Sequence, residues 1–118
     1  MLKIGIYGYG NLGRGVEAAV ALNDDTELVG VFTRRDPATV KIRTSGVAVY
    51  HTDELENFKG KIDVLIICGG SATDLPEMTP ALAKHFNVID SFDTHAKIPE
   101  HFENVDDAAK IGDNIALI

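Results

Sequence analysis

The chain has 118 residues, of which 45% are hydrophobic and 25% charged, as in an ordinary globular domain. Eighteen acidic residues against eleven basic ones give a formal net charge of -7, which repels nucleic acids and anionic membranes and argues against both as partners. A single cysteine excludes an intramolecular disulfide, and no apolar run reaches the roughly 18 residues of a membrane span. We expect one domain over residues 1–118 and a cytoplasmic location.

The first motif along the chain is a Gly-x-Gly-x-x-Gly turn. An apolar strand pattern over 2–7 leads into Gly8, Gly10 and Gly13, with a helix expected from about Asn11. Gly8 permits a tight reversal, Gly10 lets the backbone approach a pyrophosphate, and Gly13 lets the helix lie close on the strand. A second strand about twenty residues later completes the context of a dinucleotide-binding turn. An ordinary glycine-rich turn is the alternative.

The segment after this turn predicts an amphipathic helix that ends at about residue 23. Its apolar residues at helical spacing, which we expect to pack on a sheet, are Leu12, Val16, Ala19 and Val20. The apolar run 27–33 then predicts a second strand. The result is a strand-helix-strand unit, which must be right-handed.

The second strand ends in Thr33, Arg34 and Arg35, without the acidic residue that enzymes using NAD usually present to the ribose 2′-hydroxyl. A guanidinium group matches the geometry of a phosphate, and an aspartate in its place would repel one. The pattern therefore favours NADP, whose 2′-phosphate these three residues would bind. The alternative is a pair of solvated loop arginines.

Two further strands are predicted in the middle of the chain. The weaker covers about 47–50 and precedes a helical turn over 53–58, and the stronger is the apolar run 62–68. The loop over 69–76 is rich in small residues. Because ligands of an open parallel sheet lie beyond the carboxyl ends of its strands, we expect this loop beside the glycine turn. A plain helix cap is the alternative.

The next helix is expected over about 76–85, with Thr73 or Asp74 as its cap. Its inward face would carry Met78, Leu82 and Phe86. Cys68 ends the preceding strand, and no neighbour in sequence would depress its pKa. We therefore expect a buried, inert thiol.

The last third of the chain predicts a strand over 87–90, a polar cluster at 91–95, a helix over 99–111 and a sixth strand over 115–118. Together the elements predict an α/β fold, a doubly wound parallel sheet of Rossmann type with strand order 3-2-1-4-5-6. Domains seldom stop inside a core strand, so we expect a fragment. The four histidines lack zinc-site spacing, and no metal is expected.

Four stretches resemble the meso-diaminopimelate dehydrogenases, which use NADP for the reversible oxidative deamination of the D-centre of meso-2,6-diaminopimelate. They are residues 8–14, 31–35, 70–77 and 90–95. Many dehydrogenases share the first stretch, whereas the last two are far more specific to this family. The resemblance spans nearly the whole chain.

The resemblance implies a role for each stretch. The pyrophosphate would lie against the first, the 2′-phosphate against the second, and the ribose and nicotinamide against the last two. The implied cofactor-binding residues are Gly8, Tyr9, Gly10, Asn11, Leu12, Gly13, Thr33, Arg34, Arg35, Gly70, Ser71, Ala72, Thr73, Phe92, Asp93 and Thr94. In the family, the aspartate that matches Asp93 reaches the D-centre of the substrate. Asp93 is therefore the implied catalytic residue, and Asp90 a structural one.

The family continues past the position of Ile118 into a substrate and dimerisation domain and a C-terminal return to the cofactor domain. We therefore expect a fragment that binds NADP without turnover and self-associates through exposed apolar surface on its helices. One alternative is a dinucleotide sensor without chemistry, which would need no carboxylate at Asp93. Homoserine dehydrogenases and dihydrodipicolinate reductases are others, against which the run Ser-Phe-Asp-Thr-His at 91–95 argues.

Overall fold

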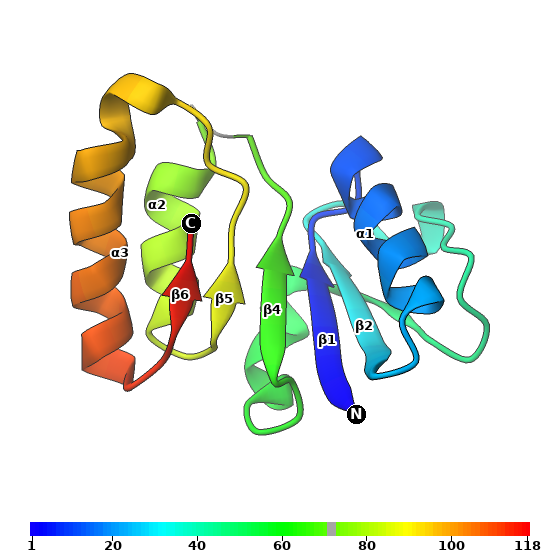
Figure 1. The fold of residues 1–118 in the computed structure, drawn as a ribbon. Coiled ribbons are helices and arrows are strands. Elements are labelled where there is room, and N and C mark those ends of the chain that lie inside the picture. Colours follow the sequence, from blue (N-terminus) through cyan, green and yellow to red (C-terminus); the bar gives the residue numbers. More distant parts are fainter. Residues whose placement is uncertain (71–72) are drawn as a thin grey trace.

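The structure is a computed structural model that describes residues 1–70 and 73–118. Strands and helices alternate along the chain, as the sequence predicts (Figure 1). The strands are β1 (Leu2–Tyr7), β2 (Thr26–Thr33), β3 (Val49–His51), β4 (Val64–Ile67), β5 (Val88–Ile89) and β6 (Ala116–Leu117). The α-helices are α1 (Asn11–Leu22), α2 (Leu75–Ala83) and α3 (Ile98–Gly112), and short 3-10 helices cover Pro37–Thr39, Thr52–Phe58 and His95–Lys97.

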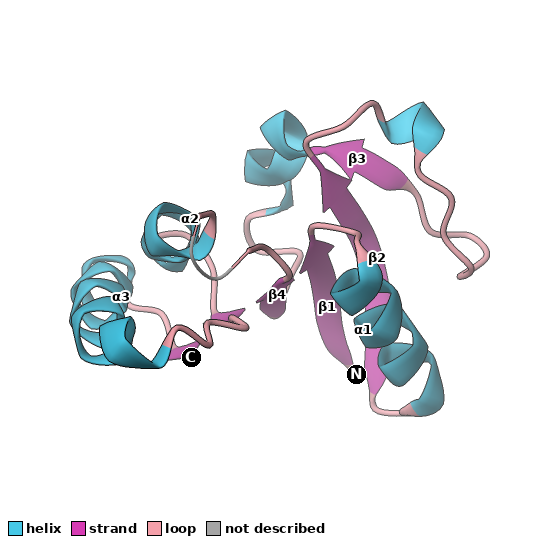
Figure 2. Cartoon of the chain, turned by 90° about the horizontal axis from the view of Figure 1, so that it is seen from above, coloured by secondary structure: helices cyan, strands magenta, loops and turns pink. Residues whose placement is uncertain are grey.

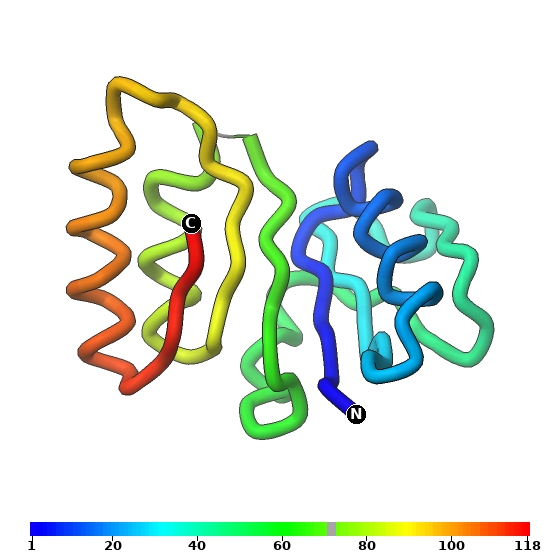
Figure 3. The backbone as a smooth tube through the Cα atoms, in the orientation of Figure 1, coloured from blue at the N-terminus to red at the C-terminus, as the bar shows by residue number. Residues whose placement is uncertain are grey.

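The six strands form one sheet in the order β3-β2-β1-β4-β5-β6, and every neighbouring pair is parallel. The predicted doubly wound sheet and its strand order are confirmed. The backbone builds outward from β1 to β3 and then returns to place β4 on the other side of β1 (Figure 3). The switch point of the sheet, where ligands of such folds bind, therefore lies between β1 and β4.

Helices cover the sheet from both sides, with α1 on the face over β1 and β2 and with α2 and α3 on the opposite face (Figure 2). Val31 and Phe32 of β2 are fully buried on opposite faces, because successive strand residues alternate. The cluster beneath α1 contains Ile6, Tyr9, Leu28, Val31 and Val40. The larger cluster on the other face contains Phe32, Leu55, Ile62, Leu65, Ile67, Leu75, Ala83, Phe86, Val88, Val105, Ala108 and Ala109.

The buried face of α1 differs from the predicted stripe. Leu12 is 48% exposed, and the buried positions of the helix are Gly13 and Glu17. The reason is the close approach of Gly13 to the strand, since a Cβ at Gly13 would collide with the carbonyl oxygen of Gly8. This contact turns the helix so that Glu17, one turn later, faces the sheet. The predicted Ala19 is also exposed.

The buried face of α2 also differs from the prediction. Its buried residues are Leu75, Thr79 and Ala83, at helical spacing, whereas Met78 and Leu82 are only partly buried. Thr79 can point inward because its hydroxyl donates a hydrogen bond to a carboxylate oxygen of Asp90. Thr79 therefore lies at the centre of the buried face of α2, whereas hydrophobic periodicity assigned that face to the apolar Met78 and Leu82.

The strands after β3 are shorter than predicted at 62–68, 87–90 and 115–118. Asn87 adds side-chain hydrogen bonds before β5. Its side-chain amide donates to the carbonyl of Asp63 at 3.0 Å, and its side-chain oxygen accepts from the amide of Ile115 at 2.9 Å. These bonds supplement the backbone bonds from Leu65 to Asn87 and from Val88 to Ile115, which join the same three strands.

Apolar side chains form a row on the face of the sheet that α2 and α3 do not cover. Ile66 pairs with Ile89, and Ile89 with Leu117, so the three side chains point to one face. Ile89 is 36% and Leu117 59% exposed, whereas Ile6, next in the row, is fully buried beneath α1. In Figure 1, α2 lies behind β5 and β6, and α1 lies in front of the other half. Apolar surface on a helix was expected, and Phe102 of α3 is indeed 59% exposed.

We expect the isolated chain to self-associate through this row, because contiguous exposed apolar surface usually finds a partner. Light scattering of concentrated protein should show species larger than the monomer. Leu117→Lys should shift the population toward monomer. Leu22→Lys is the matched control, since Leu22 is 84% exposed at the far end of α1. A strictly monomeric wild-type chain would contradict this expectation.

A buried carboxylate joins α1 to the loop before β3. Glu17 accepts the hydroxyl of Tyr9 on one oxygen, and its other oxygen accepts from the amide of Arg43 at 3.0 Å and from the amide and hydroxyl of Thr44 at 2.8 and 2.7 Å. Burial alone would raise the pKa of Glu17, but these hydrogen bonds to its charged form outweigh burial and lower it. Burial, together with Glu17, raises the pKa of Tyr9.

Glu17 should make the fold sensitive to acid. A carboxylate whose pKa is lowered on folding stabilises the fold above its unfolded pKa of 4.5, and that contribution is lost as the pH falls through the lower folded pKa. We expect Tm to drop below about pH 4.5, and to drop less steeply in Glu17→Gln, whose Tm is already reduced at neutral pH. Circular dichroism melts across this range measure both. The exposed Glu27→Gln is the control, and an identical slope in both variants would refute the assignment.

Candidate functional site

The carboxyl ends of the central strands are hydrogen-bonded to one another at the switch point. The amide of Gly8 donates to the carbonyl of Phe32 on β2 at 2.8 Å. The amide of Cys68, after β4, donates to the carbonyl of Tyr7 on β1, also at 2.8 Å. The hydroxyl of Ser91, after β5, lies 3.4 Å from the carbonyl oxygen of Ile67. The loops that the sequence predicts after β1, β2, β4 and β5 therefore meet at one edge of the sheet.

Gly8 and Gly13 have the steric reasons that the sequence suggests. Gly8 has a φ of 97°, which disfavours any other residue, and a Cβ there would lie 2.7 Å from the carbonyl oxygen of Cys68. Glycine is also required at position 13, because a Cβ there would collide with the carbonyl oxygen of Gly8. At Gly10, by contrast, a Cβ would meet no atom of the described protein within 4 Å. The space beside Gly10 is therefore open.

The N-terminus of α1 is open toward this space. Gly10 is the N-cap, and among the described residues no side chain caps the helix and no acidic residue stands in its first turn. Asn11 and Leu12 are exposed there. The first amides of a helix lack internal partners and carry partial positive charge, so this end can bind an anion.

Tyr9 contributes differently from the residues around it. Its side chain is 5% exposed and packs in the cluster beneath α1, where it donates to Glu17. Only the backbone of Tyr9 can therefore line a ligand in this conformation. That backbone is linked to the next loop, because its carbonyl accepts a hydrogen bond from the guanidinium of Arg35 at 3.1 Å.

The two arginines after β2 lie at the site and are held by different partners. Arg35 reaches the glycine turn, and its amide is fixed by the buried hydroxyl of Thr33 at 3.1 Å. Arg34 lies 3.5 Å from a carboxylate oxygen of Asp74, and its side chain is 64% exposed. Arg34 therefore spans from β2 toward the start of α2 across the switch point. Its partner Asp74 was not anticipated from the sequence, because the two residues are 40 positions apart.

The loop after β4 is organised by Asp74 in a way that corrects the predicted helix cap. Asp74 occupies the N-cap position of α2, but its carboxylate does not cap the helix and instead accepts from the amide of Gly70 at 2.9 Å. The amides of Asp74 and Leu75 both donate back to the carbonyl of Gly70. The amide of Gly70 and the guanidinium of Arg34 thus contact the same carboxylate. Ser71 and Ala72 lie outside the described residues.

A small crevice of about 30 Å³ opens at this edge, lined by Tyr7, Gly8, Phe32, Arg34, Thr52, Cys68, Gly69 and Met78. Burial raises the pKa of the Cys68 thiol to about 11, which agrees with the predicted inert thiol. Burial likewise raises the pKa of Tyr7, against a smaller opposing effect of a hydrogen bond with Thr52. A larger hollow of about 260 Å³ lies between α3 and β6, away from these loops. Another, of about 240 Å³, lies beside the loop after β5 and is lined by Pro76, Phe92, Lys97, Glu100, His101 and Asn104.

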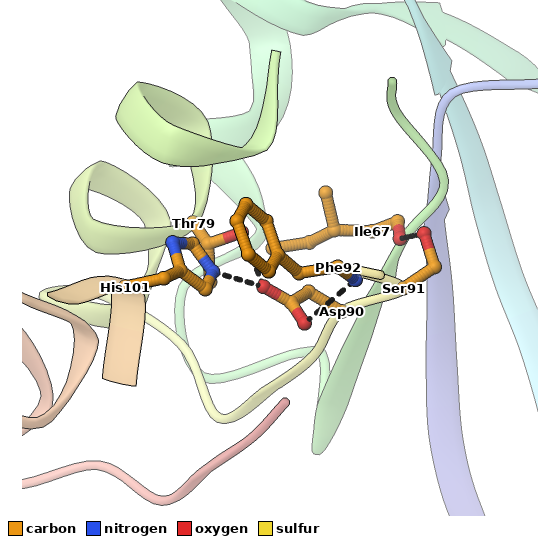
Figure 4. Close-up of polar contacts among 6 residues, drawn as sticks. All are labelled: Ile67, Thr79, Asp90, Ser91, Phe92 and His101. Atoms are coloured by element: carbon orange, nitrogen blue, oxygen red, sulfur yellow. Dashed lines mark hydrogen bonds and ion pairs between the residues drawn. The ribbon is translucent and has the colours of Figure 1, made fainter. Parts of the chain in front are cut away.

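The loop after β5 is anchored by a buried network (Figure 4). Asp90 accepts hydrogen bonds from the hydroxyl of Thr79 on α2 at 2.9 Å, from His101 Nε2 on α3 at 2.7 Å and from the amide of Phe92 at 3.2 Å. The rings of Phe92 and His101 stack with their centroids 4.0 Å apart. Asp93 and Thr94 follow directly, Asp93 exposed and Thr94 half-buried.

The expected structural role of Asp90 agrees with this burial, whereas His101 and Thr79 were not anticipated as its partners. A signal for His101 exists in the sequence, since it precedes Val105 and Ala108 at helical spacing on the buried face of α3. Among the described residues, no group of three or more histidine, cysteine or acidic side chains could hold a metal ion. Within the same residues, none of the helices has the length and apolar character needed to cross a membrane.

The chain was compared with known proteins. No family model matches it. A meso-diaminopimelate D-dehydrogenase of Ureibacillus thermosphaericus is 59% identical over 117 residues, which make up 99% of this chain and 36% of that protein. The chain therefore spans about a third of the length of the curated relatives it matches.

Two solved structures agree. A mutant meso-diaminopimelate dehydrogenase of Clostridium tetani with DAP is 50% identical, with a TM-score of 0.90 over 100% of this chain and 36% of that one. An engineered D-amino acid dehydrogenase bound to NADP+ is 37% identical, with a TM-score of 0.87 over 98% and 34% of the two chains.

Proposed function

We propose that this chain, which belongs to the family of meso-diaminopimelate dehydrogenases, is the NADP-binding domain of such an enzyme over residues 1–118. The observation that carries the proposal is the pair Arg34 and Arg35, held beside a glycine turn and an open helix N-terminus. The relatives are about three times as long, so the reaction belongs to the longer protein. A cytoplasmic location and a homo-oligomeric assembly are parts of this proposal.

The open N-terminus of α1 would bind the pyrophosphate of NADP. Gly10, Asn11, Leu12 and Gly13 supply amides at a helix end, and no side chain of the described residues fills the space beside Gly10. Gly8 and the backbone of Tyr9 shape the turn beneath. These amides explain how a chain with a net charge of -7 can bind an anion, because they act at contact distance while the overall charge acts through screened solvent.

The 2′-phosphate would be bound by Arg34 and Arg35, with Thr33 fixing the backbone between them. In the structure, Arg34 pairs with the carboxylate of Asp74 and Arg35 with a backbone carbonyl. Both guanidinium groups are thus held at the end of β2 by partners that leave other N–H donors for a phosphate.

The loops after β4 and β5 would hold the ribose and nicotinamide, through Gly70, Ser71, Ala72, Thr73, Phe92 and Thr94. NADP, when bound, supplies the hydride acceptor. Asp93 lies on the second of these loops and is exposed, and its carboxylate would bind the ammonium group of an amino acid substrate. A carboxylate in this place can orient the D-centre and stabilise positive charge that develops there.

The preference for NADP over NAD tests the proposal directly. Each charge-assisted hydrogen bond from an arginine to the 2′-phosphate contributes about 1.5 to 3 kcal/mol, so the wild-type chain should bind NADP more tightly. Replacing Arg34 and Arg35 by alanine should remove the preference in isothermal titration. Arg43→Ala, which removes one positive charge outside the site, should keep the preference for NADP. Equal affinity of the wild-type chain for both dinucleotides would show that these arginines do not bind the 2′-phosphate.

Gly10 offers a second test of the pyrophosphate site. A Cβ at Gly10 meets open space in the protein, so Gly10→Ala should leave Tm nearly unchanged while weakening NADP binding by about tenfold or more through a clash with the ligand. Gly15→Ala is the matched control, because a Cβ at Gly15 on α1 also meets open space. If both variants bound NADP as the wild type does, the pyrophosphate would lie elsewhere.

Asp93 should matter for turnover and little for cofactor affinity. In the longer protein, Asp93→Asn should lower kcat/KM for meso-diaminopimelate by at least about a hundredfold, since it keeps the shape and removes the charge. The Kd for NADP should stay within a few-fold. Near-normal turnover would disprove the catalytic role, and a large loss of NADP binding would instead make Asp93 a cofactor residue.

A further inference from the structure

We propose that Asp90 is a positioning residue, which fixes the loop after β5 so that Phe92 and Asp93 face the nicotinamide end of the cofactor site. The proposal rests on the proposed function, because it assigns a task within that site. It begins from a buried carboxylate that the binding and catalytic roles above do not use.

The side chain of Asp90 is fully buried, and its hydrogen bonds come from three elements. Thr79 on α2 and His101 on α3 donate to Oδ2, and the amide of Phe92 donates to Oδ1. Burying a carboxylate is unfavourable unless its oxygens are hydrogen-bonded, and here two helices supply donors. The carboxylate is therefore held from one side by the helices and holds the loop with its other oxygen.

The same network fixes the loop at two further points. The ring of Phe92 stacks on His101 at an angle of 12°, so the partner of Asp90 also orients the first aromatic side chain of the loop. The hydroxyl of Ser91 lies 3.4 Å from the carbonyl oxygen of Ile67 on β4. Figure 4 shows these contacts converging on the two residues that immediately precede Asp93. A substitution of Asp90 should therefore change the positions of Phe92 and Asp93.

An amide is a poorer partner here than the carboxylate. Asparagine has one acceptor oxygen, so Asp90→Asn either turns its N–H₂ group toward the amide of Phe92, which can only donate, or requires the Thr79 hydroxyl and His101 Nε2 to accept where they now donate. Thr79→Val removes one donor without changing the side-chain shape, and Thr79→Ser keeps it. Thr79 is fully buried on α2 and belongs to none of the binding loops.

The test is isothermal titration of the 118-residue chain with NADP and with 2′-phospho-ADP-ribose, which lacks only the nicotinamide. The wild-type chain should bind NADP more tightly. In Asp90→Asn the Kd for NADP should rise by about tenfold, the scale of one lost buried hydrogen bond to a charged group, while the Kd for 2′-phospho-ADP-ribose stays within about twofold. Thr79→Val should show the same selective loss, and Thr79→Ser should match the wild type.

The outcomes separate the two proposals. Equal weakening of both ligands would show that Asp90 only supports the fold, and unchanged NADP binding would show that it positions nothing; either result overturns the inference. Equal wild-type affinity for the two ligands also overturns it while leaving the NADP-binding role in place. Failure of the wild-type chain to bind either ligand would overturn the proposed function and the inference with it. If Asp90→Asn does not fold, Thr79→Val decides.

Discussion

The site depends on the close contact between the two ends of the glycine turn. Gly8 reverses the chain at a φ of 97°, and Gly13 then packs against the carbonyl oxygen of Gly8. No side chain could be accommodated at either position, so α1 starts directly above the end of β1. This contact orients α1, turns Glu17 inward, and leaves the first helical amides facing the open space beside Gly10. A looser turn would bury those amides or aim them elsewhere.

The polar groups around this turn act locally, which reconciles an acidic protein with an anionic ligand. Three charged groups near the site are held by specific contacts: Arg35 with the carbonyl of Tyr9, Arg34 with Asp74, and Glu17 with the loop before β3. Pairing of this kind holds long side chains in place before a ligand arrives, which reduces the conformational entropy that binding must remove. The arrangement favours a preorganised site over a general electrostatic attraction.

The two halves of the sheet are stabilised by different means. The half around β1 and β2 is covered on both faces, whereas β4, β5 and β6 are covered by α2 and α3 on one face and leave Ile89 and Leu117 exposed on the other. In the second half, hydrogen bonds among Thr79, Asp90 and His101 tie both helices to the end of β5. Such a network requires specific geometry, and it lies directly behind the loop that carries Asp93.

The sequence by itself determined the order of the elements, the strand order of the sheet and the loops that meet at its carboxyl edge. Those features follow from periodicity and from glycine geometry, which act over a few residues, and from the handedness of parallel crossovers. The individual site roles assigned from the resemblance remain predictions. The tertiary structure alone decided that Glu17 and Thr79 are buried, that Asp90 pairs with His101, that Arg34 reaches Asp74, and that one half of the sheet has an open face. The polar contacts among these join residues 11 to 40 positions apart, and no local pattern encodes which distant donor will satisfy a buried carboxylate. The open face depends on which side of the sheet each helix covers.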